Sequence, residues 1–132
     1  MLGALGWTLA ACGDDGEREN RDRPPAPINV TAAVIDGGVQ VSLRSFGAGP
    51  IRLIVTNQTG RAQSVTLETE DVSEGPGLTQ TTLPIQPRDT GLIEADVPEG
   101  AYALRTNDRR IKPAAVEVGA SRPSSQDDLL LP

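Results

Sequence analysis

The sequence predicts an all-β fold, a Greek-key antiparallel β-sandwich formed by residues 28–118. Apolar and polar residues alternate over several short runs, and this period of two is typical of half-buried strands. Turn sequences rich in glycine, proline and asparagine separate the runs. No stretch shows the 3.6-residue periodicity of an amphipathic helix. Seven or eight short strands within about 90 residues therefore favour two packed sheets.

Ahead of the predicted sandwich, the chain begins with an apolar, uncharged segment of the length found in signal peptides. This segment is too short to span a bilayer as a helix. It ends in Leu9, Ala10, Ala11 and Cys12, and Cys12 is the only cysteine of the chain. The four residues resemble the lipobox of bacterial lipoproteins, in which the signal peptide is cleaved before the cysteine and the cysteine sulfur carries a diacylglyceryl group.

The lipobox resemblance implies that residues 1–11 are a signal peptide and that lipidated Cys12 anchors the protein on the extracytoplasmic face of the cell membrane. The segment departs from the usual pattern because it contains no Lys or Arg. An N-terminus with an incidental free thiol is the alternative. Residues 12–27 are rich in charge and end in prolines, so we expect a flexible, disordered tether.

The predicted strands have apolar residues on one face and polar residues on the other. In chain order they are 28–35 (INVTAAVI), 39–43 (VQVSL), 51–57 (IRLIVTN), 64–68 (SVTLE), 101–105 (AYALR) and 115–118 (AVEV). The sequence Asp-Gly-Gly at 36–38 predicts a hairpin between the first two strands. Residues 119–132 are polar and are expected to form a disordered tail, with Leu129, Leu130 and Leu131 either free or docked on the domain.

The segment VPEGAYAL at 97–104 predicts a tyrosine corner, a feature of Greek-key sandwiches. Gly100 stands two residues before Tyr102, at the start of a strand. In such a corner the phenol hydroxyl bonds to backbone upstream while the ring packs in the core. We therefore expect a structural role for Tyr102, the only tyrosine of the chain.

Two stretches, IRLIVTNQTGRAQSVTL at 51–67 and VPEGAYALRTNDRRIKPAAVEV at 97–118, resemble the cupredoxins, the blue-copper β-sandwich proteins. In that family a histidine ligand follows the asparagine that ends the first strand by about six residues. A cysteine ligand follows the tyrosine, and a second histidine and a methionine lie in the next loop. Counted from Asn57 and Tyr102, the first two ligand positions hold Gln63 and Thr106.

Gln63 and Thr106 make the copper positions degenerate, because a blue-copper site needs two imidazoles and a thiolate. The chain contains no histidine, and Cys12 lies on the tether. The resemblance therefore implies the fold, while we expect no metal, no other cofactor and no electron transfer. A metal or electron-transfer protein with ligands supplied by a partner is the alternative.

Charged residues offer few sites for catalysis. The lack of histidine removes the usual base for a serine nucleophile. The pairs Glu68 with Glu70 and Glu94 with Asp96 each share a strand face, and we interpret them as solvated outer faces rather than proton-sharing dyads. A calcium site within 68–77 is an alternative without the EF-hand spacing. We therefore expect the protein not to be an enzyme.

A basic cluster follows the tyrosine strand. Its members are Arg105, Arg109, Arg110 and Lys112, with Asp108 as the only acidic residue among them. Guanidinium groups bind phosphate and carboxylate well, so the cluster predicts contact with an anionic ligand or an acidic partner, and the alternative is a merely solvated loop. The net charge of −6 and the 2% aromatic content argue against nucleic acid.

Together these features favour a lipid-anchored, non-catalytic binding or accessory module of the bacterial cell envelope. We expect a monomer that contacts the membrane through its anchor and an envelope protein or an anionic ligand through its domain.

Overall fold

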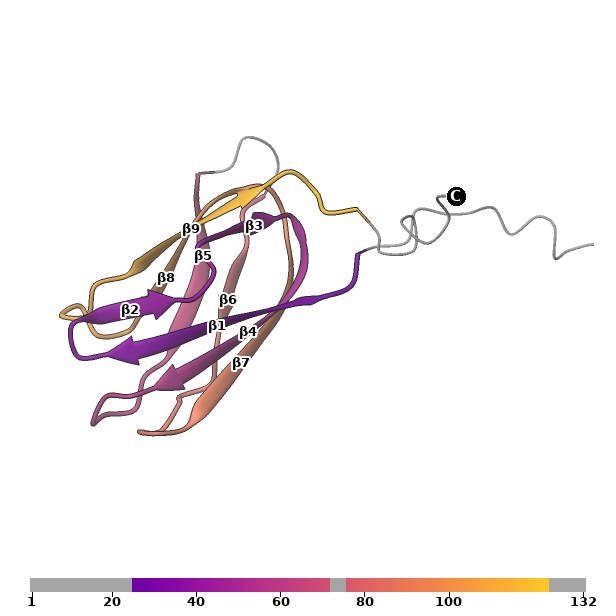
Figure 1. The fold of residues 1–132 in the computed structure, drawn as a ribbon. Helices are drawn as coiled ribbons and strands as arrows, with labels where there is room; N and C mark the ends of the chain where they lie inside the picture. Colours follow the sequence, from indigo (N-terminus) through magenta and orange to yellow (C-terminus); the bar gives the residue numbers. More distant parts are fainter. Residues whose placement is uncertain (1–24, 72–75, 124–132) are drawn as a thin grey trace, which may run out of the picture.

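The computed structural model describes residues 25–71 and 76–123 of the 132-residue chain. The candidate lipobox 9–12 and the three C-terminal leucines lie outside the described residues. The described part contains nine strands and no helix (Figure 1), and therefore no helix that could cross a membrane. The strands are β1 (Ile28–Ile35), β2 (Gly38–Val41), β3 (Ser45–Gly47), β4 (Gly49–Asn57), β5 (Val65–Asp71), β6 (Thr79–Thr81), β7 (Thr90–Val97), β8 (Gly100–Thr106) and β9 (Ala114–Gly119).

The strands form two sheets that pack face to face, so the predicted sandwich is confirmed (Figure 1). One sheet has the order β2-β1-β4-β7 and the other the order β3-β9-β8-β5-β6. The expectation of purely antiparallel sheets needs correction, because β1 pairs in parallel with β4 and β3 pairs in parallel with β9. After β1 and β2 the chain crosses to the second sheet as β3 and returns as β4. This crossover lets β4 run in the same direction as β1.

The alternation of apolar and polar residues did not predict three of the strands, β3, β6 and β7. The strands β3 and β6 have three residues each, too few to show a period of two. In β7 the burial alternates regularly, but apolar Leu92 occupies an exposed position and so breaks the apolar–polar alternation of the sequence. Position in the sheet, rather than local sequence, fixes these strands, because β7 pairs along the whole of β4.

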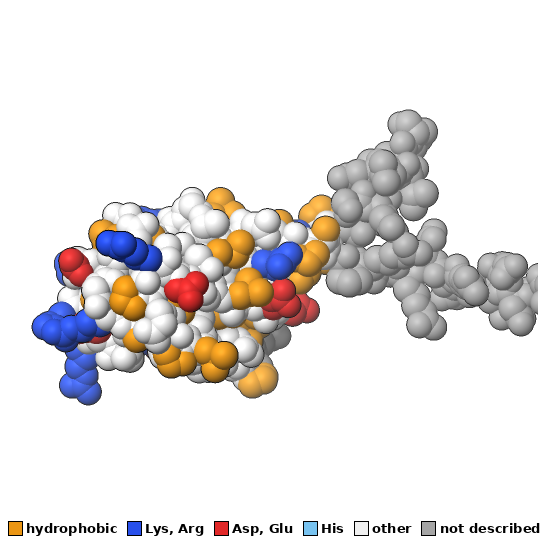
Figure 2. Space-filling model, turned by 90° about the horizontal axis from the view of Figure 1, so that it is seen from below, with side chains coloured by type: hydrophobic (Ala, Val, Ile, Leu, Met, Phe, Trp, Pro, Cys, Tyr) orange, Lys and Arg blue, Asp and Glu red, His pale blue; other side chains and the backbone are white. Residues whose placement is uncertain are grey.

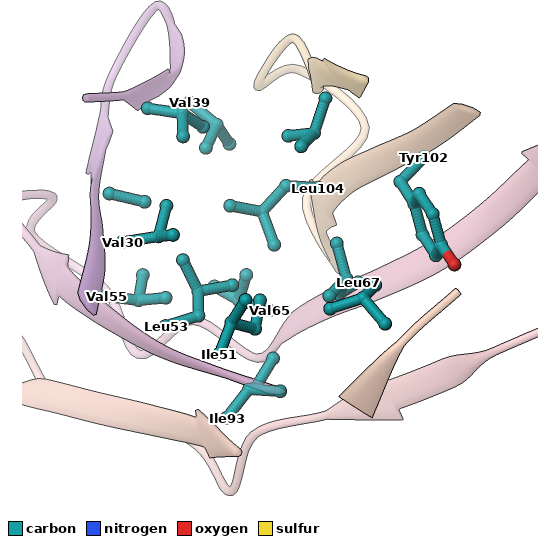
Figure 3. Close-up of a cluster of buried hydrophobic side chains, with 14 of the residues drawn as sticks. Val30, Val39, Ile51, Leu53, Val55, Val65, Leu67, Ile93, Tyr102 and Leu104 are labelled. Carbon is teal, nitrogen blue, oxygen red and sulfur yellow. The ribbon is translucent and has the colours of Figure 1, made fainter. Parts of the chain in front are cut away.

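The core lies between the sheets and consists of the inward faces of the strands (Figure 3). Leu53 and Val55 of β4 are buried, as are Leu67 of β5 and Leu104 of β8. Leu104 has no exposed surface. The predicted inward register of these strands is therefore confirmed.

The predicted tyrosine corner is also confirmed. The hydroxyl of Tyr102 donates a hydrogen bond of 2.6 Å to the carbonyl oxygen of Pro98. The ring is buried beside Leu67 (Figure 3). Burial raises the pKa of the Tyr102 phenol above its ordinary value, because the charged phenolate would lose its hydration. Tyr102 therefore fixes the turn between β7 and β8 as a structural residue.

Both ends of the described chain meet at Gly49, at the end of the sandwich that we call the tether end (Figure 1). A Cβ at Gly49, whose φ is +140°, would lie 2.8 Å from Nη2 of Arg122 and 3.0 Å from Cγ of Pro25. The Arg122 guanidinium donates to the carbonyl oxygens of Gly47 and Pro50. The ordered domain therefore continues past 118 to Arg122, because this side chain satisfies carbonyls at the end of β3 and at the start of β4.

Candidate functional site

The opposite end of the sandwich, which we call the distal end, contains a pocket of about 380 Å³. The distal end is formed by the turn at 36–37 and by the loops 58–64, 86–89 and 107–113. We call the hollow the distal pocket. The residues of its wall that carry the argument below are Asp36, Arg61, Gln63, Asp108, Arg110 and Ile111.

Asn57, the last residue of β4, positions the loop 58–64. It has no exposed surface, and all four of its side-chain hydrogen-bonding positions are used. Its Nδ2 donates to the carbonyl oxygens of Arg61 at 2.7 Å and Ile85 at 2.8 Å. Its Oδ1 accepts from the backbone nitrogen and from the hydroxyl of Thr59, at 2.9 and 2.7 Å. The loop is therefore held in one shape before any ligand arrives.

Gln63 lies at the inner wall of the distal pocket and is only 2% exposed. Its backbone pairs with that of Ile85 through bonds of 2.8 and 3.0 Å. Its Nε2 donates to Oγ1 of Thr59 at 3.2 Å. The hydroxyl of Thr59 has two acceptors for its single hydrogen, Oδ1 of Asn57 at 2.7 Å and the carbonyl oxygen of Arg61 at 2.9 Å. The Thr59 oxygen therefore accepts from the amide nitrogen of Gln63.

The other amide atom, Oε1 of Gln63, has no hydrogen-bond donor within the described residues. A buried amide oxygen without a donor costs about 1–3 kcal/mol, so native structures almost always satisfy such a group. Gln63 is therefore held by two backbone bonds and one side-chain bond, and its buried Oε1 is left without a donor among the described residues.

Loop 107–113 forms the facing wall and is cross-linked to the rest of the distal end. The hydroxyl of Thr106 bonds to both backbone groups of Asp108, at 3.0 and 3.1 Å, and so closes the first turn of the loop. Asn107 and Ser64 exchange two bonds of 3.0 and 3.1 Å, which join the two walls. The carbonyl oxygen of Lys112 accepts from the backbone nitrogen of Val39, which fixes the loop to β2. The pocket therefore has rigid walls.

The charges of the wall are organised around Asp108. Nε of Arg110 lies 3.2 Å from one carboxylate oxygen of Asp108, and Nη2 lies 3.3 Å from the other. The side-chain and backbone hydrogen bonds from Arg110, together with the nearby charge of Arg61, hold the pKa of the Asp108 carboxyl below its ordinary value. Arg61 makes no ion pair with any residue that the structure describes.

The four basic residues predicted as one cluster occupy different places. Arg105 lies on the outer face of β8, where Nε is 2.5 Å from Glu68 and Nη2 is 3.2 Å from Glu70. Arg110 lines the distal pocket, while Arg109 and Lys112 are exposed on the same loop. Arg109, Arg110 and Lys112 belong to the distal end. Arg105 does not, because it lies within β8 and its guanidinium is already paired with two glutamates.

The carboxylate pairs lie on outer faces, as predicted. Glu68 and Glu70 flank Arg105, and Nε of Arg52 lies 3.4 Å from Glu94. No group of three His, Cys, Asp or Glu residues that could hold a metal occurs in residues 25–71 and 76–123. Glu68, Glu70 and Glu94 are therefore partners of arginines on the sheet surfaces.

Basic side chains predominate at the distal end as a whole. Its turn and loops carry five basic residues, Arg61, Arg88, Arg109, Arg110 and Lys112, and three acidic ones, Asp36, Asp89 and Asp108. Figure 2 shows basic side chains gathered at this end of the molecule, away from the grey segments. The distal end is thus locally positive in a chain of net charge −6.

Comparison of the chain with known proteins identifies the type of fold. No protein-family model and no curated protein sequence matches the chain. Auracyanin A, a blue copper protein from Chloroflexus aurantiacus, superposes with a TM-score of 0.57 at 10% identity, over 71% of this chain and 100% of that one. The chain has a cupredoxin-like fold. At this identity the likeness shows the fold alone.

Two further copper-protein structures align less closely. A mutant of amicyanin in its reduced Cu(I) form has a TM-score of 0.45 at 11% identity, covering 75% of this chain and 94% of that one. A Cu-containing nitrite reductase from Thermus scotoductus has a TM-score of 0.47 at 9% identity, covering 80% of this chain and 30% of that one.

The cupredoxin-like fold implies copper, but the residues at the distal pocket do not fit it. Gln63 does lie here, facing loop 107–113, whereas Thr106 is not among the residues that line the pocket. The groups offered are amide, hydroxyl and carboxylate oxygens, with two guanidinium groups that repel a cation. Blue-copper chemistry requires imidazole and thiolate ligands. Of the two positions that the resemblance assigns to copper ligands, only Gln63 lines the distal pocket, and the donor set of the pocket differs from that of a blue-copper site.

Sequence reasoning singled out Gln63, Asp108 and Arg110 but missed the other two charged members of the pocket, Arg61 and Asp36. Arg61 follows a Thr-Gly turn and lies far in sequence from the basic run at 105–112. Asp36 was interpreted only as a hairpin residue. The signal that could have pointed to Arg61 is Asn57, since an asparagine at the end of a strand can organise the turn that follows it.

Proposed function

We propose that this protein is a lipid-anchored, non-catalytic binding module of the bacterial cell envelope, and that the distal end is its binding face. One observation carries the proposal: the loops whose residues line the distal pocket and the two ends of the described chain lie at opposite ends of the sandwich (Figure 1). An anchor at Cys12 would join the domain through Pro25, at the tether end. The distal end would then lie at the end of the domain opposite to its attachment and be free to bind.

Exposed Arg109 and Lys112 extend the binding face beyond the pocket. Neither side chain forms an ion pair with the described residues, whereas Arg105 and Arg110 do. Exposed cations on a rigid loop favour contact with carboxylate or phosphate groups. We therefore assign them the contact with an acidic surface of an envelope protein.

The anchor is tested by fatty-acid labelling and membrane fractionation of Cys12→Ala in a bacterial host. We expect the variant to lose the label and to leave the membrane fraction, because the sulfur that carries the acyl chains is gone. Thr8→Ala, in the apolar segment but outside the four-residue motif, is the matched control and should keep both. An unlabelled wild type, with equal membrane retention of the two forms, would refute the anchor.

The binding face is tested separately by a photo-cross-linking residue at position 109, with position 45 as the control. Both positions are exposed, but Ser45 begins β3, in the second sheet and outside the distal loops. We expect a discrete protein adduct in intact cells from position 109 and none from position 45. The reverse pattern would move the binding face away from the distal end.

Copper-dependent electron transfer is the second candidate, and it is favoured by the fold alone. We expect the wild-type chain to retain no copper after dialysis against metal-free buffer. The double variant Gln63→His with Thr106→Cys supplies only one imidazole and one thiolate, so we expect weak or unstable binding. An intense blue absorption or stoichiometric copper in the wild-type protein would move electron transfer to first place.

A further inference from the structure

The edges of the two sheets differ in how well they are protected against pairing with another strand. An edge strand presents unpaired backbone groups, and natural proteins usually keep such a strand short or interrupted. Within the described residues β2, β3 and β6 are edge strands of three or four residues. The fourth edge strand, β7, has eight residues, contains no proline or lysine, and pairs with β4 without a register shift (Figure 1). In the described domain β7 is therefore the one long open edge.

Alternate residues of β7 direct their backbone groups to this open edge. The backbone of Asn57 bonds to Arg88 and Asp89, just before β7, so Asn57 faces that strand. Because hydrogen bonding alternates along an antiparallel pair, every second residue of β4 before Asn57 also bonds to β7. The partners of these residues are Gly91, Ile93, Ala95 and Val97. The N–H and C=O groups that point away from β4 are those of Thr90, Leu92, Glu94 and Asp96.

Apolar side chains lie exposed along the open edge. Leu92 is 47% exposed and lies opposite half-buried Ile54 on the outer face of the sheet. Leu83 is 85% exposed and follows Thr82, whose side chain lies beside Gly91 of β7. Figure 2 looks onto this side of the molecule and shows apolar side chains at its surface. Two of the three large hydrophobic side chains exposed in the described residues are therefore in β7 or next to it.

We propose that a second copy of this chain covers the open edge, in a two-fold dimer whose β7 strands pair antiparallel. A two-fold axis brings the same surface of both copies together, so the edge must be complementary to its own reverse. This dimer goes beyond the proposed function, because it involves neither the anchor nor the distal pocket. It replaces the expectation of a monomer that came from the sequence.

The side chains select one register among the three that centre on the middle of β7. Glu94 opposite Glu94 places like charges against each other, which is destabilising. Leu92 opposite Glu94 places an apolar side chain against a carboxylate. Leu92 opposite Leu92 joins Ile54 and Leu92 of both copies into one apolar row across the paired sheets. The same register brings Asp96 of one copy level with Arg88 of the other, so we assign Leu92 to the axis.

Arg88 and Asp96 are available for this contact. Both side chains are exposed, and neither forms an ion pair within the described residues. Asp89, the neighbour of Arg88, accepts from the next backbone nitrogen at 2.8 Å. Glu94 lies 3.4 Å from Arg52, so Asp96 is the carboxylate of β7 that has no described partner. The two-fold axis then gives two contacts between Asp96 and Arg88 in each dimer.

The first test is sedimentation equilibrium of the full chain carrying Cys12→Ala, which removes the only cysteine and with it any lipid. We expect a monomer–dimer equilibrium with a Kd of about 100 µM or tighter. Asp96→Arg should weaken the dimer by about tenfold or more, because like charges then meet twice. Adding Arg88→Asp should restore it. Glu117→Arg, the same change of charge at an exposed position of β9, is the control and should leave the Kd unchanged.

The second test reads the register through disulfides in the same background. Leu92→Cys should form an intermolecular disulfide under mild oxidation, because hydrogen-bonded residues opposite each other have Cα atoms about 5.5 Å apart, within disulfide range. Glu94→Cys lies two residues further on the same exposed face. It should cross-link at least about tenfold more slowly, since four residues of strand, about 13 Å, separate it from its own copy.

A chain that stays monomeric at about 1 mM would overturn the proposal, and so would a Glu94→Cys disulfide that forms faster than that of Leu92→Cys. Hydrogen exchange distinguishes the other occupants of the edge. The amides of Leu92, Glu94 and Asp96 should become protected only as the concentration rises and the dimer forms. Protection of these amides in the monomer would assign the edge to a segment of the same chain and would overturn the second copy.

Discussion

The core between the sheets and the distal pocket are built from opposite kinds of residue. The core is apolar and is held by the burial of side chains such as Leu53 and Leu104. The pocket is polar and is held by bonds between side chains and backbone, above all those of Asn57. The difference implies that core substitutions change stability, while pocket substitutions change the shape and charge of one end.

The largest expected effect comes from the core. Leu104→Ala should lower the free energy of unfolding by about 2–5 kcal/mol, because it leaves a cavity between the sheets at a side chain with no exposed surface. Arg105→Ala, the next residue on the same strand but on the outer face, should cost less than about 1 kcal/mol. Urea denaturation measures both. A larger loss for the arginine variant would mean that the side-chain register of β8 is wrong.

Asn57→Ala should have the next largest effect. Asn57 connects the core to the distal pocket, because it ends the core strand β4 and holds the loop 58–64. The variant removes one of the two donors to each of the carbonyl oxygens of Arg61 and Ile85. It also removes the acceptor of the backbone nitrogen of Thr59, at a total cost of about 1–3 kcal/mol. Hydrogen exchange should accelerate in loop 58–64 and stay slow in the core strands. Asn29→Ala, an exposed position of β1, is the control. Uniform acceleration over all strands would show that the pocket scaffold and the core are one unit.

Tyr102→Phe should cost about 1 kcal/mol at neutral pH through the lost bond to Pro98. The pH dependence is the sharper test. Because burial raises the pKa of Tyr102 in the folded state, the folded form holds its proton longer than the unfolded one. The contribution of Tyr102 to stability should therefore be constant below about pH 10 and fall as the pH rises through the raised pKa. The phenylalanine variant should lose this alkaline decline, and a decline that persists would exclude Tyr102 as its cause.

The smallest effect concerns the charge pair of the pocket. Arg110 lowers the pKa of Asp108, so the stabilising contribution of the pair is present above the ordinary carboxyl pKa and is lost as the pH falls through the lowered one. NMR titration should show Asp108 moving back towards its ordinary pKa in Arg110→Ala. Arg109→Ala should leave the Asp108 titration in place. An unchanged Asp108 in the first variant would mean that Arg61 alone sets its charge.

The same contrast explains what the sequence could predict. Alternation identified the inward residues of β1, β4, β5 and β8 because burial of one face demands a period of two. It could not identify β3 or β6, which are too short, or the parallel pairing of β1 with β4, which follows from the crossover. In the pocket, the position of Gln63 could be predicted by counting from Asn57. Which of its two amide atoms bonds to Thr59, and which is left without a partner, could not be predicted. No local sequence pattern encodes that choice. The sequence also could not show that Arg61 and Asp36 line the same pocket, because they lie on separate loops that only the fold brings together.

The parallel pairing of β1 and β4 has a mechanical consequence. Both strands run from the tether end to the distal end, with seven partner pairs between Ile28 and Val34 on β1. A load applied at Pro25 and resisted at loop 107–113 pulls along β1, so its ladder is sheared and the hydrogen bonds must yield together. A load between Pro25 and Arg122, which meet at one end, peels the bonds one after another. Single-molecule pulling should need more force in the first geometry, which is the one that an anchored module with a bound partner would experience.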